Sequence, residues 1–168
     1  MGEYTMTTFL SYSGVVTLIR DFQTGAKEPS GCYKFISVRN TSGGTVNFIA
    51  SPYTYFVDNV CLMVGDPVTG FYDANAPVPM IYPPQYQAIV MAKISPSQNV
   101  KVDYFDDQLV SSDGMLKLNV DPFTQMQLEN GQTFTRDPAN RNLIVLYGPS
   151  TRSIPAQTTP YKIIVMCR

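Results

Sequence analysis

The sequence predicts an all-β protein in which one small unit of strands is present twice. Three observations support this prediction. Two segments of the first half recur in the same order in the second half, and apolar residues alternate with polar ones over short stretches. The 168 residues also include 13 prolines and 11 glycines, which suit many turns between short strands. No segment shows the 3.6-residue apolar period of an amphipathic helix.

The first recurring segment joins residues 44–54 to residues 114–124 without a gap. Glycine, proline and threonine recur at identical places, and the apolar residues between them occupy matching alternate positions. The turn sequences 40–44 and 111–114 precede the two copies. Residues 45–50 and 115–120 are therefore predicted to be half-buried strands.

The second recurring segment joins residues 86–91 to residues 161–166, and a tyrosine lies fourteen residues before each copy, at Tyr72 and Tyr147. Both copies end in a continuous apolar run, which is typical of a strand that is buried on both faces. The second copy contains five additional residues, which we place in a polar loop within residues 129–141.

Breakers and apolar runs together predict ten strands. They are residues 14–22, 33–39, 45–50, 68–72 and 86–93 in the first unit, and 99–105, 108–110, 115–120, 143–147 and 161–166 in the second. Residues 53–64 are expected to form another strand or a connecting turn. The proline-rich stretches 76–84 and 154–160 are expected to cross a sheet end in extended form, because proline removes a backbone donor and fixes φ.

This pattern predicts an N-terminal arm at 1–13, a first β unit at 14–94 and a second at 95–168. Each unit is expected to be a five-stranded OB-like barrel or a small β-sandwich. The segment Val64-Gly65-Asp66-Pro67-Val68-Thr69-Gly70-Phe71-Tyr72-Asp73, with Pro83-Pro84-Gln85-Tyr86 after it, resembles uncharacterised duplicated β-rich proteins of spore-forming Firmicutes. The resemblance covers most of both units, and it implies no activity, cofactor or site residue.

Catalysis is not expected. The chain has no histidine, which removes the commonest general base, the Ser-His and Cys-His pairs and the commonest transition-metal ligand. The glycines Gly31, Gly43 and Gly44 do not open a helix and fit no nucleotide-binding fingerprint. We therefore predict no enzyme, no catalytic residues and no cofactor-binding residues.

We predict no metal-ligating residues. If the chain holds a metal ion, acidic residues are the candidate ligands. Calcium could be held by Asp103, Asp106, Asp107 and Asp113, or in the first unit by Asp58, Asp66 and Asp73. The spacing fits no EF-hand loop. The alternative interpretation, which we favour, is that Asp106, Asp107 and Asp113 serve a hairpin turn.

Net charge is −1 and the basic residues are scattered, so duplex DNA is not an expected partner. An OB-like barrel could still stack bases or sugars on exposed aromatic residues. The residues that could form such a face are Tyr33, Lys34, Phe35, Arg39, Tyr53, Tyr55 and Phe56. The alternative is that these tyrosines pack at sheet ends with their hydroxyls in water.

The N-terminal arm is the feature for which we predict a function. It has no counterpart in the second unit and carries neither charge nor proline between Tyr4 and Tyr12. Such a segment pairs readily with an exposed sheet edge. The assembly residues are predicted to be Tyr4, Thr5, Met6, Thr7, Thr8, Phe9, Leu10 and Tyr12. The alternative is a frayed tail or an ordinary first strand.

We therefore expect a structural protein that assembles with its own copies, by strand addition, into a filament or surface layer. The alternative is an OB-type module that binds single-stranded nucleic acid or an oligosaccharide. The three cysteines are expected to be buried thiols, and the alternative is an intermolecular disulfide through Cys167. No segment is apolar enough for membrane insertion. The expected location is extracellular or at a cell or spore surface, with the cytoplasm as the alternative suggested by the N-terminal sequence.

Overall fold

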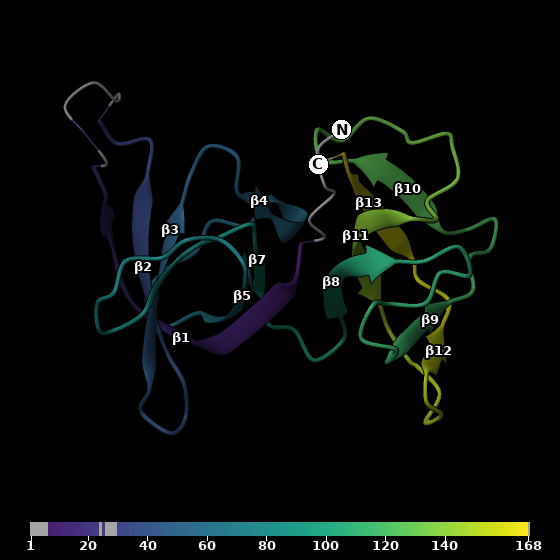
Figure 1. Ribbon diagram of the computed structural model, residues 1–168, viewed down its shortest axis with the longest axis horizontal. Helices are drawn as coiled ribbons and strands as arrows, with labels where there is room; N and C mark the ends of the chain where they lie inside the picture. The colour runs from purple at the N-terminus through teal and green to yellow at the C-terminus, as the bar shows by residue number, and fades with distance from the viewer. Residues whose placement is uncertain (1–6, 24, 26–29, 168) are drawn as a thin grey trace. The chain divides into compact units, whose positions relative to one another are not determined.

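The computed structural model describes residues 7–23, 25 and 30–167. These residues form an all-β structure (Figure 1), which confirms the predicted class; the helical part of the described chain is one 3₁₀ turn, η1, at Val57–Asn59. The chain divides into two compact units, Met1–Ile94 and Ser95–Arg168.

Unit 1 is a seven-stranded sheet with the order β4-β7-β5-β1-β2-β3-β6. The strands are β1 (Phe9–Asp21), β2 (Lys34–Arg39), β3 (Thr45–Ala50), β4 (Tyr55–Phe56), β5 (Pro67–Asp73), β6 (Gln85–Gln87) and β7 (Val90–Lys93). The predicted strand 86–93 is therefore divided into β6 and β7. Between them, the Ala88 N–H donates to Ile49 O of β3 at 2.9 Å, and the Ile89 N–H donates to Phe71 O of β5 at 2.8 Å. This one segment therefore connects the two sides of the sheet.

Strand β1 is the longest strand and serves two neighbours. Its first half pairs with β5 from Phe9 to Val15, and its second half pairs with β2 from Val15 to Asp21. The register shifts between Val16 and Leu18, where an irregularity bends the strand. A Cβ at Gly14 would lie 2.3 Å from Arg39 O, so only glycine permits the close approach of β1 to the end of β2.

The core of unit 1 is centred on Phe48, which is fully buried. Alternation along β2 and β3 directs one side chain in two toward this core. Its buried members are Val16, Ile36, Val38, Val46, Phe48, Ala50, Val68, Ala88 and Met91. Gly70 of β5 leaves the space that the Phe48 ring occupies, because a Cβ there would lie 2.5 Å from the ring.

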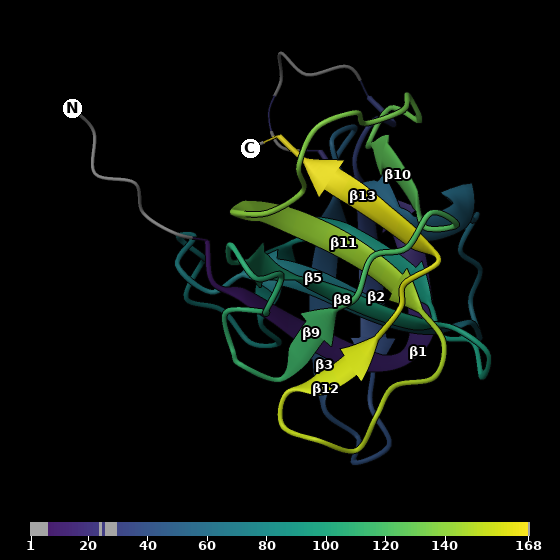
Figure 2. The same ribbon diagram turned by 90° about the vertical axis from the view of Figure 1, so that its right-hand side faces the viewer.

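Unit 2 contains a four-stranded sheet, with the order β10-β13-β11-β8, and a two-stranded sheet of β12 and β9 (Figure 2). The strands are β8 (Asn99–Phe105), β9 (Leu116–Leu118), β10 (Gln125–Leu128), β11 (Arg141–Tyr147), β12 (Ala156–Thr158) and β13 (Lys162–Met166). Its buried core residues are Phe105, Leu116, Leu118, Phe134, Leu143, Val145, Ile163 and Val165.

The two units pair their strands in the same way. In unit 1, β1 and β7 are antiparallel to β5, while β3 is parallel to β6 and β4 is parallel to β7. In unit 2, β8 and β13 are antiparallel to β11, while β9 is parallel to β12 and β10 is parallel to β13. Each unit also has one cis peptide bond shortly before its short parallel strand, Tyr82–Pro83 or Ile154–Pro155.

Unit 2 has no counterpart of β2 among its described strands. The predicted strand 108–110 is wrong, because the segment makes only single bridges, from Val110 to Lys117 and from Ser111 to Phe105. Its backbone is turned instead. Leu109 has a φ of 58°, and the Asp106 carboxylate accepts the Gln108 and Val110 N–H groups at 2.9 and 3.0 Å.

The second recurring segment has a different register from the one that the sequence suggested. The Tyr55 N–H donates to Ile89 O in unit 1, and the Gln125 N–H donates to Tyr161 O in unit 2. Tyr161 thus occupies the position of Ile89, three residues from the expected partner Tyr86. Two runs of β-branched residues align almost equally well at several offsets, whereas hydrogen bonding selects one of them.

Candidate functional site

The described part of the expected N-terminal arm lies within unit 1. Phe9, Leu10 and Tyr12 belong to β1 and face Asp73, Tyr72 and Gly70 of β5. The boundary expected after residue 13 therefore does not separate an arm from the sheet, because the pairing with β5 begins at Phe9. Tyr4, Thr5 and Met6 lie outside the described residues.

Thr7 and Thr8 precede β1 directly. The Ala74 N–H donates to Thr8 O at 2.8 Å, and the Asn75 side-chain amide donates to the Thr8 hydroxyl at 3.2 Å. These two contacts extend the pairing with the β5 side by one residue beyond the strand. Thr8 therefore fixes the point at which the chain enters the sheet.

The first half of β1 has one open edge. Its pairing with β2 begins only at Val15, so no described strand pairs with Phe9–Ser13 on the side away from β5. The nearest described contact on that side is the Tyr12 hydroxyl, which donates to Gly44 O at 2.7 Å. Leu10 in this segment is 48% exposed.

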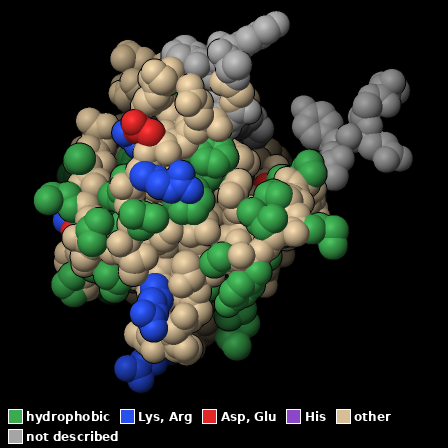
Figure 3. All heavy atoms as spheres, turned by 90° about the vertical axis from the view of Figure 1, so that its left-hand side faces the viewer, with side chains coloured by type: hydrophobic (Ala, Val, Ile, Leu, Met, Phe, Trp, Pro, Cys, Tyr) green, Lys and Arg blue, Asp and Glu red, His purple; other side chains and the backbone are tan. Residues whose placement is uncertain are grey.

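An apolar loop follows β5 on the same end of unit 1. Asp73 pairs with Phe9, and the chain then runs through the proline-rich residues 76–84 to β6. Four large apolar side chains of this loop lie in solvent: Val78, Met80, Ile81 and Tyr82, which are 46%, 102%, 55% and 86% exposed. Figure 3 shows hydrophobic side chains gathered at several places on the face that it draws. Contiguous apolar surface on a soluble protein usually marks a place of contact with another molecule.

Each unit also displays one aromatic side chain on a rigid turn. Tyr53 is 78% exposed in unit 1, and Phe123 is 89% exposed in unit 2. The turns are closed by equivalent hydrogen bonds, from the Tyr53 N–H to the Ser51 hydroxyl at 3.1 Å and from the Phe123 N–H to the Asp121 carboxylate at 2.9 Å. Both aromatic rings are thus held in solvent by ordered backbone.

The seven residues of the expected stacking face do not form one surface. Phe35 is only 8% exposed, because the Phe22 ring lies 6.2 Å from it and the Arg20 guanidinium lies 4.1 Å from its centroid. Tyr55 and Phe56 are half-buried in β4. Lys34 and Arg39 are exposed at opposite ends of β2, and Tyr53 is on the turn described above.

The acidic residues of unit 2 are used within turns. Asp103, which is 6% exposed, accepts hydrogen bonds from the Ser112 hydroxyl at 2.6 Å and from the Tyr104 N–H at 2.8 Å. Asp106 caps the turn before Val110, and Asp107 is exposed. Within the residues that the structure describes, no group of three acidic, cysteine or histidine side chains could hold a metal ion.

The acidic residues of unit 1 lie apart in three different local settings. Asp66 accepts from the Met63 N–H at 2.8 Å and lies 3.4 Å from Lys93 Nζ. Asp73 accepts from the Asn75 N–H at 2.9 Å. Asp58 lies in η1 with a φ of 58°. The structure does not bring these three carboxylates together.

Asp113 and Tyr147 of unit 2 both interact with Lys101, and both have shifted pKa values. Burial acts to raise the pKa of Asp113, but hydrogen bonds from Lys101, from the Ser111 hydroxyl at 2.6 Å and from the Met115 N–H at 3.0 Å outweigh it and lower the pKa. Burial raises the pKa of Tyr147, where Lys101 opposes the shift and Asp113 adds to it.

Two stacked tyrosines occupy the corresponding end of unit 1. The Tyr72 and Tyr86 rings lie 3.8 Å apart and are inclined by 9°, and both lie beside Phe48. Burial, with a hydrogen bond and charge interaction from Tyr86, raises the pKa of Tyr72 to about 12. This phenol is therefore neutral at physiological pH and unsuited to act as a base.

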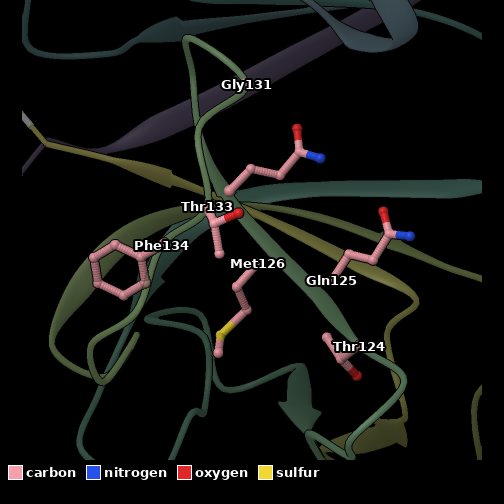
Figure 4. Close-up of a pocket in the computed structure, with 7 residues that line it drawn as sticks. Thr124, Gln125, Met126, Gly131, Thr133 and Phe134 are labelled. Carbon is pink, nitrogen blue, oxygen red and sulfur yellow. The ribbon is translucent and has the colours of Figure 1, made fainter.

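A hollow of about 390 Å³ lies against the hairpin that follows β10 (Figure 4). Its lining consists of Thr124, Gln125, Met126, Gln127, Gly131, Thr133 and Phe134. None of these residues is charged. The turn and return segment of this hairpin lie in the region 129–141, where the sequence predicted five additional residues in a polar loop. A glycine after Asn130 and polar residues on alternate positions were the signals that could have identified it.

The three cysteines are all exposed and form no disulfide within the chain, so the expectation that Cys32, Cys61 and Cys167 are buried thiols is wrong. A disulfide between copies through Cys167 stays a prediction. Every buried side-chain nitrogen or oxygen among the described residues has a hydrogen-bond partner. In that same part of the chain, no helix has the length and apolar character needed to cross a membrane.

Comparisons with known proteins add no relative. No family model matches the chain, and neither a curated protein nor a solved structure matches it.

Proposed function

We propose that this chain is a structural subunit that binds further copies of itself by strand addition, that unit 1 is an OB-like barrel, and that unit 2, whose β12 and β9 form a separate sheet, is a small β-sandwich. The observation that carries the proposal is the open edge of β1 at Phe9–Ser13. An unpaired strand edge is a template for another strand, and soluble proteins usually cover or interrupt such edges.

The strand pairings of unit 1 support the barrel. Following the hydrogen-bonded neighbours leads from β1 through β2 and β3 to β6, continues along the chain into β7, and returns through β5 to β1. This path passes through six strands, two of which, β6 and β7, follow each other directly along the chain, and its long first strand bends between two partners, as in an OB-like barrel. A two-sheet sandwich would leave β6 and β7 in separate sheets without this return. The matching pairings of unit 2 support a duplication.

The direction of the backbone groups supports the open edge. In an antiparallel pair, one residue directs its N–H and C=O to the partner strand and the next directs both away. Ala74 bonds to Thr8, and the Val16 N–H donates to Asp66 O at 2.9 Å, so the even-numbered residues between them face β5. Phe9, Ser11 and Ser13 therefore direct their N–H and C=O groups away from β5, toward the unoccupied side.

Residues 4–7 of a second copy are the strand that we propose for this edge. Tyr4-Thr5-Met6-Thr7 is uncharged, contains no proline and is rich in residues that favour β structure. One copy would offer the segment and the other the edge, so the contact would join unlike surfaces. Such contacts extend into filaments unless the rotation between copies closes a ring.

The apolar loop 76–84 supports a second contact beside the edge. It starts after Asp73, the β5 partner of Phe9, so its exposed side chains begin where a strand added to β1 would arrive. Four prolines restrict the loop in advance, which reduces the conformational entropy lost when a neighbour covers it.

Two variants test the proposal. Deletion of residues 1–6 removes the donor strand without touching β1, and Ser11→Pro removes one N–H from the acceptor edge while sparing the bonds to β5. We expect the full chain to give particles much larger than a monomer by light scattering and electron microscopy. Both variants should remain folded and monomeric, and a mixture of the two should not assemble into filaments.

Leu10→Pro is the matched control, because it removes an N–H that faces β5 and should destabilise unit 1 itself. A full chain that stays monomeric at high concentration contradicts the proposal. So does assembly that is as complete in either variant as in the full chain.

A further inference from the structure

The hollow beside β10 lies on a hairpin that has no equivalent among the described strands of unit 1. Unit 1 closes its sheet with a β4 of only two residues. In unit 2, β10 has four residues and continues through a turn into a short return segment that reaches Phe134. Phe134, Met126 and Leu128 of this hairpin contribute to the core of unit 2, whereas its polar side chains face solvent.

The hairpin is rigid enough to present a preformed surface. On one side, β10 pairs in parallel with β13 from Gln125 to Leu128. On the other side, the Leu128 N–H donates to Gln132 O at 2.8 Å, and the Phe134 N–H donates to Met126 O at 3.0 Å. The Gly131 N–H closes the turn between them by donating to Leu128 O at 3.0 Å. Gly131 has a φ of 87°, a backbone conformation that favours glycine.

The two faces of β10 differ in chemistry. Met126 and Leu128 pack against the core of unit 2, so Gln125 and Gln127 lie on the opposite face by strand alternation. Figure 4 shows the side chains of Gln125 and Met126 pointing away from each other. Gln125 and Thr133 are exposed and Gln127 is half-buried, so their side-chain donors and acceptors can reach a ligand from solvent.

We propose that this hollow binds a neutral, hydroxyl-rich ligand, namely a segment of an uncharged oligosaccharide. A carboxamide both donates and accepts, and two carboxamides with a hydroxyl can satisfy adjacent sugar hydroxyls. A volume of about 390 Å³ is within the range of small-ligand sites and suits one or two sugar rings.

The position of Phe123 fits this ligand. Phe123 directly precedes Thr124 of the lining and is 89% exposed on its locked turn. Sugar rings present apolar C–H faces that pack on exposed aromatic rings, while their hydroxyls bond to amides. An exposed aromatic residue next in sequence to an uncharged lining can supply the apolar contact, and the amides and hydroxyls of the lining can supply the polar one.

The lining argues against an anionic ligand. A nucleic acid or acidic polysaccharide requires cations that neutralise its charges, and the hollow contains none. The nearby Arg141 is engaged, since its guanidinium lies 4.8 Å from the Phe134 ring centroid and its Nε donates to Asp137 O at 3.2 Å. A polyanion is therefore the competing outcome of the test.

The test is a titration of the full chain with neutral hexasaccharides of β-1,4-linked glucose, β-1,4-linked N-acetylglucosamine and α-1,4-linked glucose, followed by backbone NMR shifts and calorimetry. An oligothymidylate and a heparin hexasaccharide are the anionic probes. At least one neutral probe should shift the signals of residues 124–134. Gln127→Ala and Thr133→Val should each weaken its binding by roughly tenfold.

Gln87→Ala, at an exposed glutamine of unit 1, is the control and should leave the binding unchanged. Both site variants alter exposed or half-exposed side chains of a hairpin held by backbone bonds, so they should fold normally. The proposal is overturned if no neutral probe shifts these signals at about 10 mM. It is also overturned if an anionic probe alone binds, or if Gln127→Ala and Thr133→Val bind as well as the unmodified chain.

Discussion

Thr54 and Thr124 occupy the same position in the two units. The Thr54 hydroxyl donates to Ala88 O at 2.7 Å and accepts from the Ser51 N–H at 2.9 Å. The Thr124 hydroxyl donates to Pro160 O at 2.6 Å and accepts from the Asp121 N–H at 3.3 Å. In unit 1, the Thr54 side chain therefore joins the turn after β3 to the segment before β7. In unit 2, the Thr124 side chain joins the turn after β9 to the segment before β13.

This relationship predicts a matched pair of stability losses. Thr54→Val and Thr124→Val keep the shape of the side chain but remove a hydroxyl that bonds to two backbone groups. Each should lower the free energy of unfolding of its unit by about 1–2 kcal/mol, because a part-buried carbonyl and N–H lose their partner. Urea unfolding measures the change. Thr54→Ser and Thr124→Ser keep the hydroxyl and should recover most of it; equal losses for valine and serine would refute the role of these bonds.

Gly70 should tolerate no larger residue. A Cβ there would lie 2.5 Å from the fully buried Phe48 ring, so Gly70→Ala must displace the centre of the unit 1 core. We expect a loss of about 1–3 kcal/mol by urea unfolding. Gly148→Ala is the control, because no heavy atom lies within 4 Å of its Cβ position and it should change stability little. A Gly70→Ala protein as stable as Gly148→Ala would mean that the core is loosely packed.

Much of the strand content could be predicted because its signal is local. Alternating residues at 45–50 predicted β3 with its observed bounds, and the alternation at 99–105 did the same for β8. Short strands were missed where little apolar pattern exists. β10 reads Gln-Met-Gln-Leu, and β12 is a three-residue segment between two prolines, Pro155 and Pro160. Both are held by parallel pairing with distant residues, so the short alternation in β10 could indicate a strand but not its partner.

The candidate site was predicted less completely, because exposure is a tertiary property. An uncharged arm could be identified from composition, but the sequence could not show that Phe9–Tyr12 already pairs with β5. Likewise, Phe35 looked like a stacking residue until Phe22 and Arg20 were found to cover it. The unequal spacing of the recurring segments indicated five additional residues within 129–141. The hairpin geometry, in contrast, depends on a hydrogen bond between Met126 and Phe134.

The apolar loop yields a prediction on assembly with an internal control. Tyr82 and Ile154 each precede the cis proline of their unit and are 86% and 82% exposed. If the loop of unit 1 contacts a neighbouring copy, Met80→Ser with Tyr82→Ser should raise the protein concentration needed for assembly by at least tenfold. Ile154→Ser should have little effect, because its loop lacks the other apolar side chains. Light scattering over a dilution series measures both; equal effects would mean that assembly does not distinguish the two loops.

Asp113 predicts a loss of stability in acid. Its pKa is lowered in the folded state, so its contribution is complete above the ordinary aspartate value near 3.8 and disappears as the pH falls through the lower folded value. Asp113→Asn should therefore reduce the stability of unit 2 at neutral pH and flatten its dependence on pH below about 4. Asp107→Asn, at an exposed carboxylate, is the control. Thermal melts at several pH values would show whether the two variants respond differently, as we expect.

Tyr72 predicts a loss of stability in alkali, with the opposite sign. Burial and the contact with Tyr86 raise its pKa from 10.0 to about 12, so the folded state holds the phenol proton more tightly than the unfolded state. The resulting stabilisation is complete below pH 10 and disappears as the pH rises toward 12. Tyr72→Phe should abolish this part of the pH dependence, whereas Tyr82→Phe, at a side chain that is 86% exposed, should retain it. Urea unfolding between pH 9 and 12 measures the stability, and phenolate absorbance at 295 nm measures the ionisation of the tyrosines. If Tyr72→Phe loses stability over this range as steeply as the unmodified chain, then the stacked pair does not control the alkaline limit of unit 1.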